Sequence, residues 1–327
     1  MPSPEAARAI PDLVAAGVLS PEQAAPLLAR ARGELVPVRA ELRTLAGVAV
    51  TLLVTGAGLL VRELRDALGA LPIALLLIVA TALALVAALR RSPGFTWARP
   101  ERADWLLDAL VLLAIGLAGG SLAWIEVHFT PLGADWPLHL LAMSLLAGAL
   151  AIRFDSLAAW TLALSTFAAW RGVSLAPRAD ALDHAFDPDG GGALRLNLLL
   201  CALLFLALGR LAVRFDRKAH FEPATTFLGV LAAALVPLPG LAESGTWPLW
   251  ALALAALGAG AGAWAFRRRR RALLALGALA LYVAMTRALF ALPFAAGIGC
   301  FWFALSTVGA IVLLVVVHRR FAREEGA

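Results

Sequence analysis

The sequence predicts an all-α fold, a polytopic transmembrane helical bundle of about 10 spans with both termini in the cytoplasm. Three observations support this prediction. First, 61% of the 327 residues are hydrophobic and 15% are charged, whereas soluble domains average roughly 45–50% and about 25%. Second, the apolar residues form long runs separated by short polar turns. Third, these turns are alternately rich and poor in arginine. Because a soluble body needs a polar surface, lipid is expected to surround most of the chain.

The first segment, residues 1–43, is expected to form a cytoplasmic helical hairpin. Its first helix opens at Ser3-Pro4-Glu5 and ends near Gly17. Its second begins at Ser20-Pro21-Glu22-Gln23, with serine as the cap, proline in the first turn and glutamine three residues after the cap. We interpret the hairpin as lying against the cytoplasmic face of the membrane; a partner-binding module is the alternative.

Residues 44–318 are expected to form the transmembrane bundle, and residues 319–327 a cytoplasmic tail. A helix needs about 20 mainly apolar residues to cross the hydrocarbon core. The candidate spans are roughly residues 44–61, 67–89, 103–125, 136–152, 156–172, 194–213, 224–242, 247–266, 272–289 and 295–317. The prolines in Pro237-Leu238-Pro239-Gly240 are expected to end the seventh span early.

The distribution of positive charge predicts the orientation of the bundle. Basic residues in short loops favour the cytoplasmic side of a membrane. With the N-terminus inside, most of the 28 lysines and arginines fall on inner segments. The densest inner group is Arg267, Arg268, Arg269, Arg270 and Arg271. The outer segments hold Arg62, Arg65, Arg171, Arg178, Arg195 and Arg287. We interpret the five-arginine turn as a topology determinant; binding of anionic lipid headgroups is its alternative role.

Two segments repeat each other: Leu146–Asp155 reads LAGALAIRFD and Ala207–Asp216 reads ALGRLAVRFD. Each ends a predicted span at the inner face, so we expect a pair of spans duplicated in parallel orientation. The arginine and the aspartate of each copy are expected to hold the turn with a local ion pair. Small residues four positions apart allow helices in lipid to pack closely. They occur at Gly116 and Gly120, and at Gly258 and Gly262.

The expected outer face carries a candidate polar cluster. It comprises Glu126, His128, Asp135, His139, Arg171, Asp183, His184 and Arg287. Histidines with carboxylates can bind zinc or perform acid–base catalysis. The acidic loop 173–193 matches no complete metal-binding loop. We therefore expect no metal and no cofactor, and interpret this loop as a solvated acidic segment.

Charge inside the predicted spans is scarce, and no carboxylate reaches a span centre. Charged residues within a membrane are costly and commonly functional. The candidate inner-side pair is Asp108 in the third span with Arg210 in the sixth. A structural ion pair is the simpler interpretation of these two residues. The lack of a midplane carboxylate argues against a carrier driven by protons or sodium ions.

The sequence has no Walker lysine loop, Rossmann fingerprint, Gly-x-Ser-x-Gly elbow or HExxH, so catalytic residues stay unassigned. We expect a non-enzymatic bacterial inner-membrane protein with a packing, scaffolding or accessory role. The alternatives are a small-molecule or lipid transporter and a membrane enzyme acting at the outer face. Expected partners are anionic membrane lipids, a second copy of the chain or another membrane protein. Nucleic acid is not expected, because the basic residues gather at the ends of apolar runs.

A family resemblance rests on two segments. Residues 13–24 read LVAAGVLSPEQA and precede a run of spans, and Arg153-Phe154-Asp155-Ser156 precedes a helix that contains Ala168-Ala169-Trp170. The chain thereby resembles the bacterial predicted-membrane-protein family called domain of unknown function 2157. The resemblance extends over the N-terminal hairpin and the first six spans. It implies a helical multi-span architecture, and it brings no activity, ligand or catalytic residue.

Overall fold

The computed structural model describes residues 4–32, 39–98, 104–175 and 191–291, and scattered positions between 301 and 312. These residues form eleven α-helices and three short 3-10 helices, with no strand among them. The predicted all-α fold is therefore confirmed. The chain divides into two compact units, one of Met1–Thr44 with Phe290–Ala327 and one of Leu45–Leu289.

Helices α1 (Pro4–Ala15) and α2 (Pro21–Arg32) of the first unit form the expected hairpin. Ile10 of α1 packs with Ala24 and Ala31 of α2. The backbone N–H of Gln23 donates to Ser20 Oγ at 3.2 Å, and the backbone N–H of Ser20 donates to Gln23 Oε1 at 3.1 Å. This reciprocal cap is the one that the sequence predicts.

The long helices that follow are joined by short turns and 3-10 helices. They are α3 (Arg39–Leu68), α4 (Ala70–Arg91), α5 (Trp105–His128), α6 (Pro137–Phe154), α7 (Leu157–Leu175), α9 (Gly191–Arg214), α10 (Glu222–Leu235), α11 (Trp247–Arg267) and α12 (Arg271–Phe290). The 3-10 helices are η1 (Gly133–Asp135), η2 (Ala219–Phe221) and η3 (Pro239–Ala242). Helix α10 ends at Leu235, before the prolines, but η3 follows it and the seventh candidate span continues to Ala242, so the span itself does not end early.

Eight stretches of the described residues are long and apolar enough to cross a membrane. They are Thr44–Arg65, Ala70–Arg91, Trp105–His128, Pro137–Phe154, Leu194–Arg214, Ala219–Ala242, Trp247–Arg267 and Arg271–Phe290. They match all predicted spans except the fifth and the tenth. The fifth predicted span is helical as α7 but is not among the eight. The tenth, 295–317, lies outside the described residues apart from scattered positions.

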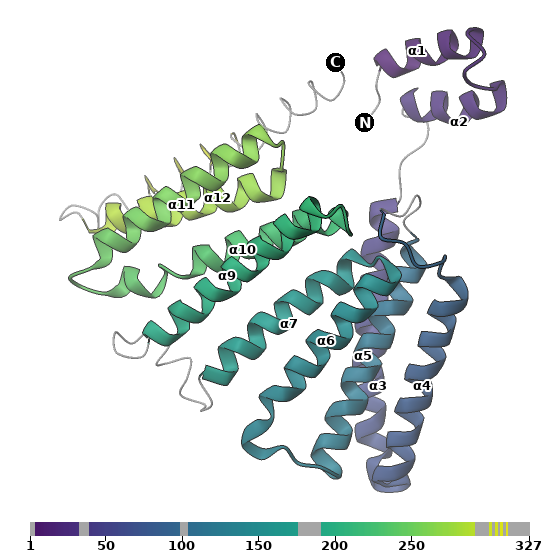
Figure 1. Ribbon diagram of the computed structural model, residues 1–327, viewed down its shortest axis with the longest axis vertical. Helices are drawn as coiled ribbons and strands as arrows, with labels where there is room; N and C mark the ends of the chain where they lie inside the picture. Colours follow the sequence, from purple (N-terminus) through teal and green to yellow (C-terminus); the bar gives the residue numbers. More distant parts are fainter. Residues whose placement is uncertain are drawn as a thin grey trace. The chain divides into compact units, whose positions relative to one another are not determined.

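Helices that are neighbours in the sequence pack side by side through the second unit (Figure 1). Contacts join α4 with α5, α5 with α6, α6 with α7, α7 with α9, α9 with α10, and α10 with α11. The core is built from small and aliphatic residues such as Val111 of α5, Ala151 of α6 and Ala159 of α7, which are fully buried. Close helix approach in lipid depends on such small side chains.

Three contacts bring four connecting turns to the same end of the bundle. Lys218 Nζ, after α9, donates to Asp155 Oδ1, after α6, at 2.6 Å. The backbone N–H of Lys218 donates to the carbonyl oxygen of Trp97, between α4 and α5, at 2.9 Å. Arg270, between α11 and α12, donates to Glu222 at the start of α10. We call this end the basic end, because its turns carry the basic residues that the sequence assigns to the inner face.

The position of α7 follows from this arrangement. Because α6 and α9 both end at the basic end, α7 must return the chain to the opposite end. Ser144 Oγ of α6 donates to the carbonyl oxygen of Ala163 in α7 at 2.9 Å. Trp160 Nε1 of α7 donates to Thr225 Oγ1 of α10 at 2.8 Å. Helix α7 therefore crosses the same thickness as its neighbours, and the fifth predicted span is retained despite its more polar composition.

The opposite end is closed by contacts of its own. Trp124 Nε1, near the end of α5, donates to the carbonyl oxygen of Ala70 at the start of α4 at 2.9 Å. Arg287 Nε, near the end of α12, donates to the carbonyl oxygen of Leu241 in η3 at 2.7 Å. Both ends of the bundle are thus held by bonds between different helices.

Glycine brings α11 and α12 into backbone contact. A methyl group on Gly277 would lie 2.7 Å from the carbonyl oxygen of Gly258 and 2.8 Å from the backbone nitrogen of Gly262. The close packing expected at Gly258 and Gly262 is therefore confirmed. Of the other expected pair, Gly116 and Gly120, only Gly116 packs closely. A methyl group on Gly116 would meet Val54 of α3, whereas one on Gly120 would have no neighbour within 4 Å.

Candidate functional site

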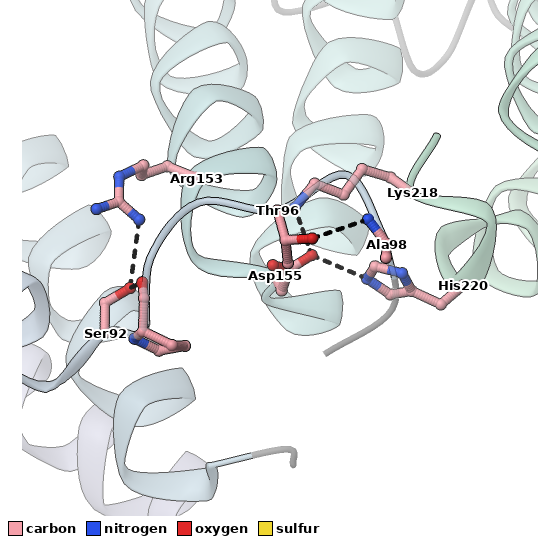
Figure 2. A network of polar contacts seen from close by, with 8 residues as sticks. Ser92, Thr96, Ala98, Arg153, Asp155, Lys218 and His220 are labelled. Carbon is pink, nitrogen blue, oxygen red and sulfur yellow. Dashed lines mark hydrogen bonds and ion pairs between the residues drawn. The ribbon is translucent and has the colours of Figure 1, made fainter. Parts of the chain in front are cut away.

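Lys218 is part of a polar network at the basic end (Figure 2). Its side chain is 5% exposed, and its Nζ lies 2.6 Å from Asp155 Oδ1 and 4.8 Å from the centre of the Phe95 ring. His220 Nε2 lies 3.3 Å from the same oxygen of Asp155. A buried ammonium group is costly unless it is paired and hydrogen-bonded. This ion pair therefore ties the turn after α6 to the turn after α9.

The network joins the ends of the two copies of the internal repeat. Asp155 and Asp216, which end the two copies, both adopt the left-handed conformation, with φ of 57° and 50°. Aspartate is among the few non-glycine residues that enter this region readily. Helices α6 and α9 thus end in the same way and at the same end, so the two copies run in the same direction. Duplication of a pair of spans stays a prediction.

The expected local ion pair is wrong for the first copy of the repeat. The carboxylate of Asp155 binds Lys218 from the turn after the second copy. Arg153 instead donates to Ser92 Oγ in the α4–α5 connection at 3.3 Å (Figure 2). The physical reason is that the turns of both copies meet at one end, where the buried lysine is a closer partner for Asp155.

Sequence reasoning missed the role of Lys218. It is the only lysine in the chain, and it stands two residues after Asp216, which ends the second copy of the repeat. The signal that could have found it was the repeat itself, because two parallel copies place Asp155 and the segment after Asp216 at the same end.

A cavity of about 230 Å³ lies beside this network. Its wall is mainly aromatic and aliphatic, with Arg217 and Lys218 as its charged members. The Trp160 ring stacks on Phe221 with 5.1 Å between ring centres. The Arg217 guanidinium group lies 5.0 Å from the centre of the Trp97 ring. Cations held over aromatic faces in this way gain an electrostatic contact, so the rings help to anchor the basic turn.

A second ion pair holds the α11–α12 turn. Arg270 Nη1 donates to Glu222 Oε1 at 2.9 Å, and Arg270 Nη2 donates to the other carboxylate oxygen. Thr226 Oγ1 also donates to Glu222 Oε1, at 2.8 Å. A bidentate arginine–carboxylate contact is among the strongest side-chain bonds. Arg270 of the five-arginine turn is therefore bound to another helix of the bundle.

The candidate inner-side pair is placed only in part. The guanidinium group of Arg210 lies 5.8 Å from the centre of the Trp264 ring, and the Arg270 guanidinium group lies 5.2 Å from the same ring. Asp108 is partly buried in the first turn of α5. The pairing of Arg210 with Asp108 stays a prediction. So do the lipid contacts of Arg267, Arg268, Arg269 and Arg271.

At the opposite end, two members of the predicted outer-face cluster meet. His139 Nδ1, in the first turn of α6, lies 3.1 Å from Glu126 Oε2, in the last turn of α5, and both side chains are largely buried. His128 stands apart, because its ring stacks on Trp124 with 3.8 Å between ring centres. Asp135 is exposed in η1.

The two arginines of the predicted cluster serve different helices. Arg171 Nε of α7 donates to Asn197 Oδ1 of α9 at 2.9 Å. Arg287 of α12 binds the Leu241 carbonyl oxygen, and its guanidinium group lies 4.5 Å from the centre of the Trp247 ring. Asp183 and His184 lie outside the described residues. Within the described part, no three histidines, cysteines or carboxylates are placed to hold a metal ion.

Arg195 and Glu243 form an ion pair at the opposite end that sequence reasoning did not foresee. Glu243 also accepts hydrogen bonds from Thr246 Oγ1 and Trp250 Nε1. The Thr246 and Arg195 bonds hold the pKa of Glu243 below its ordinary value, although partial burial acts to raise it. The carboxylate is thus fixed in its charged form between α9 and α11.

Comparison with known proteins confirms the family resemblance. Residues 11–160 match the model of the family described as "Predicted membrane protein (DUF2157)". The match runs from α1 to the first residues of α7, and so stops before the sixth span to which the resemblance was expected to extend. No curated protein and no solved structure matches the chain.

Proposed function

We propose that this multi-span membrane protein belongs to the bacterial inner membrane and has a packing, scaffolding or accessory role rather than an enzymatic one. The observation that carries this proposal is the use of its buried charges. Lys218 binds Asp155, and Arg270 binds Glu222. Arg195 binds Glu243 at the other end. Each of these pairs joins different helices, so the charges serve to hold the bundle together.

The distribution of charge along the described spans supports the same proposal. The charged side chains with assigned contacts stand within the first two or last two turns of their helices or in the connections between them. Ion and proton pathways usually require ionisable groups at membrane depth. A bundle braced at its two ends provides a rigid platform against which a partner membrane protein or a second copy can pack.

We further propose that the basic end faces the cytoplasm and, on the prediction of a tenth span, that both termini lie there. This orientation is supported by the basic residues of the four turns that meet at the basic end, because basic turns are retained on the cytoplasmic side. The residues are Arg90, Arg91, Arg153, Arg214, Arg217, Lys218, Arg267, Arg268, Arg269, Arg270 and Arg271.

Cysteine labelling in intact cells tests the orientation. In a background with Cys201→Ala and Cys300→Ala, we expect a membrane-impermeant maleimide to label Asp135→Cys in intact cells. We expect it to label Arg268→Cys only after the cells are permeabilised. Both positions are exposed, so both should react fully in detergent, which serves as the control. Labelling of Arg268→Cys from outside intact cells would reverse the proposed orientation.

The Glu126–His139 pair favours a second candidate function, a membrane enzyme acting at the opposite end. A carboxylate 3.1 Å from an imidazole nitrogen can orient the ring as a general base. In its favour, both side chains are largely buried and come from two consecutive helices, α5 and α6.

Complementation of a deletion strain separates the two candidates. For an accessory role, we expect Glu126→Gln and His139→Gln to rescue the deletion phenotype as fully as the parent chain does, because neither side chain is needed for that role. Membrane levels of each variant, measured by immunoblot, serve as the control. Loss of complementation by both variants at normal membrane levels would instead favour the enzyme.

A further inference from the structure

A groove of about 370 Å³ runs between α3, α4 and α5. Its wall includes Val54, Gly58 and Val61 from α3 and Gly116, Gly120 and Ala123 from α5. Small-ligand sites typically enclose about 300–1,000 Å³. The groove exists because α3 touches its neighbours at few points: a methyl group on Gly116 would meet Val54, but one on Gly58 or Gly120 would have no such neighbour within 4 Å.

Positive charge is concentrated at one end of this groove. Arg62 and Arg65 line it at the end nearest the turn between α3 and α4, together with His128. They follow Gly58 by four and seven residues, so they share the helix face that forms the groove wall. Glu63 lies on another face of α3 and does not line the groove. The two arginines stand at the end of the bundle that is poor in basic residues, so the bias that sets orientation does not explain them.

The apolar wall and the charged end of the groove favour different chemical groups in a bound molecule. Nearly all of the wall is apolar and runs along segments that cross the membrane, which suits an acyl chain. The two guanidinium groups at its end suit a phosphate, which arginine binds through paired N–H donors. A small soluble anion would leave the apolar wall unfilled.

From this complementarity we propose that the groove binds a membrane phospholipid with an anionic headgroup. One acyl chain lies between α3 and α5, and the headgroup lies at Arg62 and Arg65. The proposal goes beyond the accessory role, and it holds whichever side of the membrane this end faces.

Native mass spectrometry of the full chain with defined lipids tests the proposal. The protein is incubated with equal amounts of phosphatidylglycerol and phosphatidylcholine that carry identical acyl chains. We expect the unmodified chain to bind phosphatidylglycerol roughly tenfold more tightly, since each arginine near a membrane surface adds a few-fold to the binding of an anionic lipid. The variant Arg62→Gln with Arg65→Gln should bind both lipids equally. Arg90→Gln, at the basic end, should keep the preference.

Filling the groove supplies an independent test. Gly120→Leu places a side chain in the groove, and we expect it to lower the binding of both lipids about tenfold. Gly56→Leu is the matched control, because Gly56 of α3 also has open space around it but does not line the groove. This control should bind like the unmodified chain. If Gly120→Leu does not fold, Gly58→Leu fills the same groove from α3.

Two results would overturn the proposal. One is a preference for phosphatidylglycerol that survives the loss of both arginines or is absent from the unmodified chain. The other is equal lipid binding by the Gly120→Leu and Gly56→Leu variants. Neither result bears on the accessory role, which is tested by complementation.

Discussion

Replacing Asp155 with asparagine should lower the free energy of unfolding of the bundle by about 3–5 kcal/mol, the usual cost of removing one partner from a buried ion pair. Lys218 is 4% exposed, so its ammonium group would keep its desolvation penalty and lose the carboxylate that offsets it. Asparagine tolerates the left-handed conformation at this position, so the backbone is not the cause of the loss. The measurement is unfolding in detergent micelles followed by circular dichroism or by thermal aggregation.

The repeat supplies the control for this substitution. Asp216 ends the second copy with the same backbone conformation, but its side chain is exposed. Asp216→Asn should therefore change the stability by less than about 0.5 kcal/mol. Adding Lys218→Met to Asp155→Asn should restore part of the lost stability, because the unpaired charge is then removed. Equal losses for Asp155→Asn and Asp216→Asn would contradict a bracing role for the Asp155–Lys218 pair.

Replacing Gly277 with alanine should destabilise the α11–α12 pair by about 1–3 kcal/mol, the range for overpacking of a tight core. The added methyl group would meet the backbone of α11 at Gly258 and Gly262, and backbone atoms cannot turn aside as a side chain can. The two helices would have to move apart along their contact. The expected readout is a lower melting temperature in detergent micelles.

Gly260→Ala is the matched control for this prediction. Gly260 lies on α11 between the two contact glycines, and a methyl group there would have no neighbour within 4 Å. Since alanine favours a helix over glycine, this variant should be as stable as the parent or slightly more stable. A melting temperature that falls equally in the Gly260→Ala and Gly277→Ala variants would show that the helix contact is not responsible.

Much of the fold could be predicted from the sequence because its signals are local. Each span is a continuous apolar run, and each basic turn is a short segment, so neither depends on distant contacts. The Ser20–Gln23 cap is likewise a property of four adjacent residues. By contrast, α7 has a composition that falls short of a membrane span, and its crossing follows only from the contacts of α6 and α9 at the basic end.

The side-chain partners were harder to predict because they join helices that are distant in the sequence. Glu126 and His139 meet because α5 and α6 are consecutive and face each other across a short connection. The pairs of Asp155 with Lys218 and of Glu222 with Arg270 join residues that are 63 and 48 positions apart in the sequence. No local pattern specifies them. They depend on which helices become neighbours, and only the internal repeat gave an indirect sign of that.

The modest hydropathy of α7 has a consequence for synthesis of the protein. Helix α7 has Arg171 near its end and carries several hydroxyl groups. Its transfer by itself from the translocon into lipid is therefore only weakly favourable in free energy. The preceding helix, α6, binds α7 through the hydrogen bond that Ser144 donates to it. The two helices are therefore expected to exit the translocon together as a hairpin. Every later helix takes its direction from that single event, so a failure of α7 to insert would invert α9 to α12.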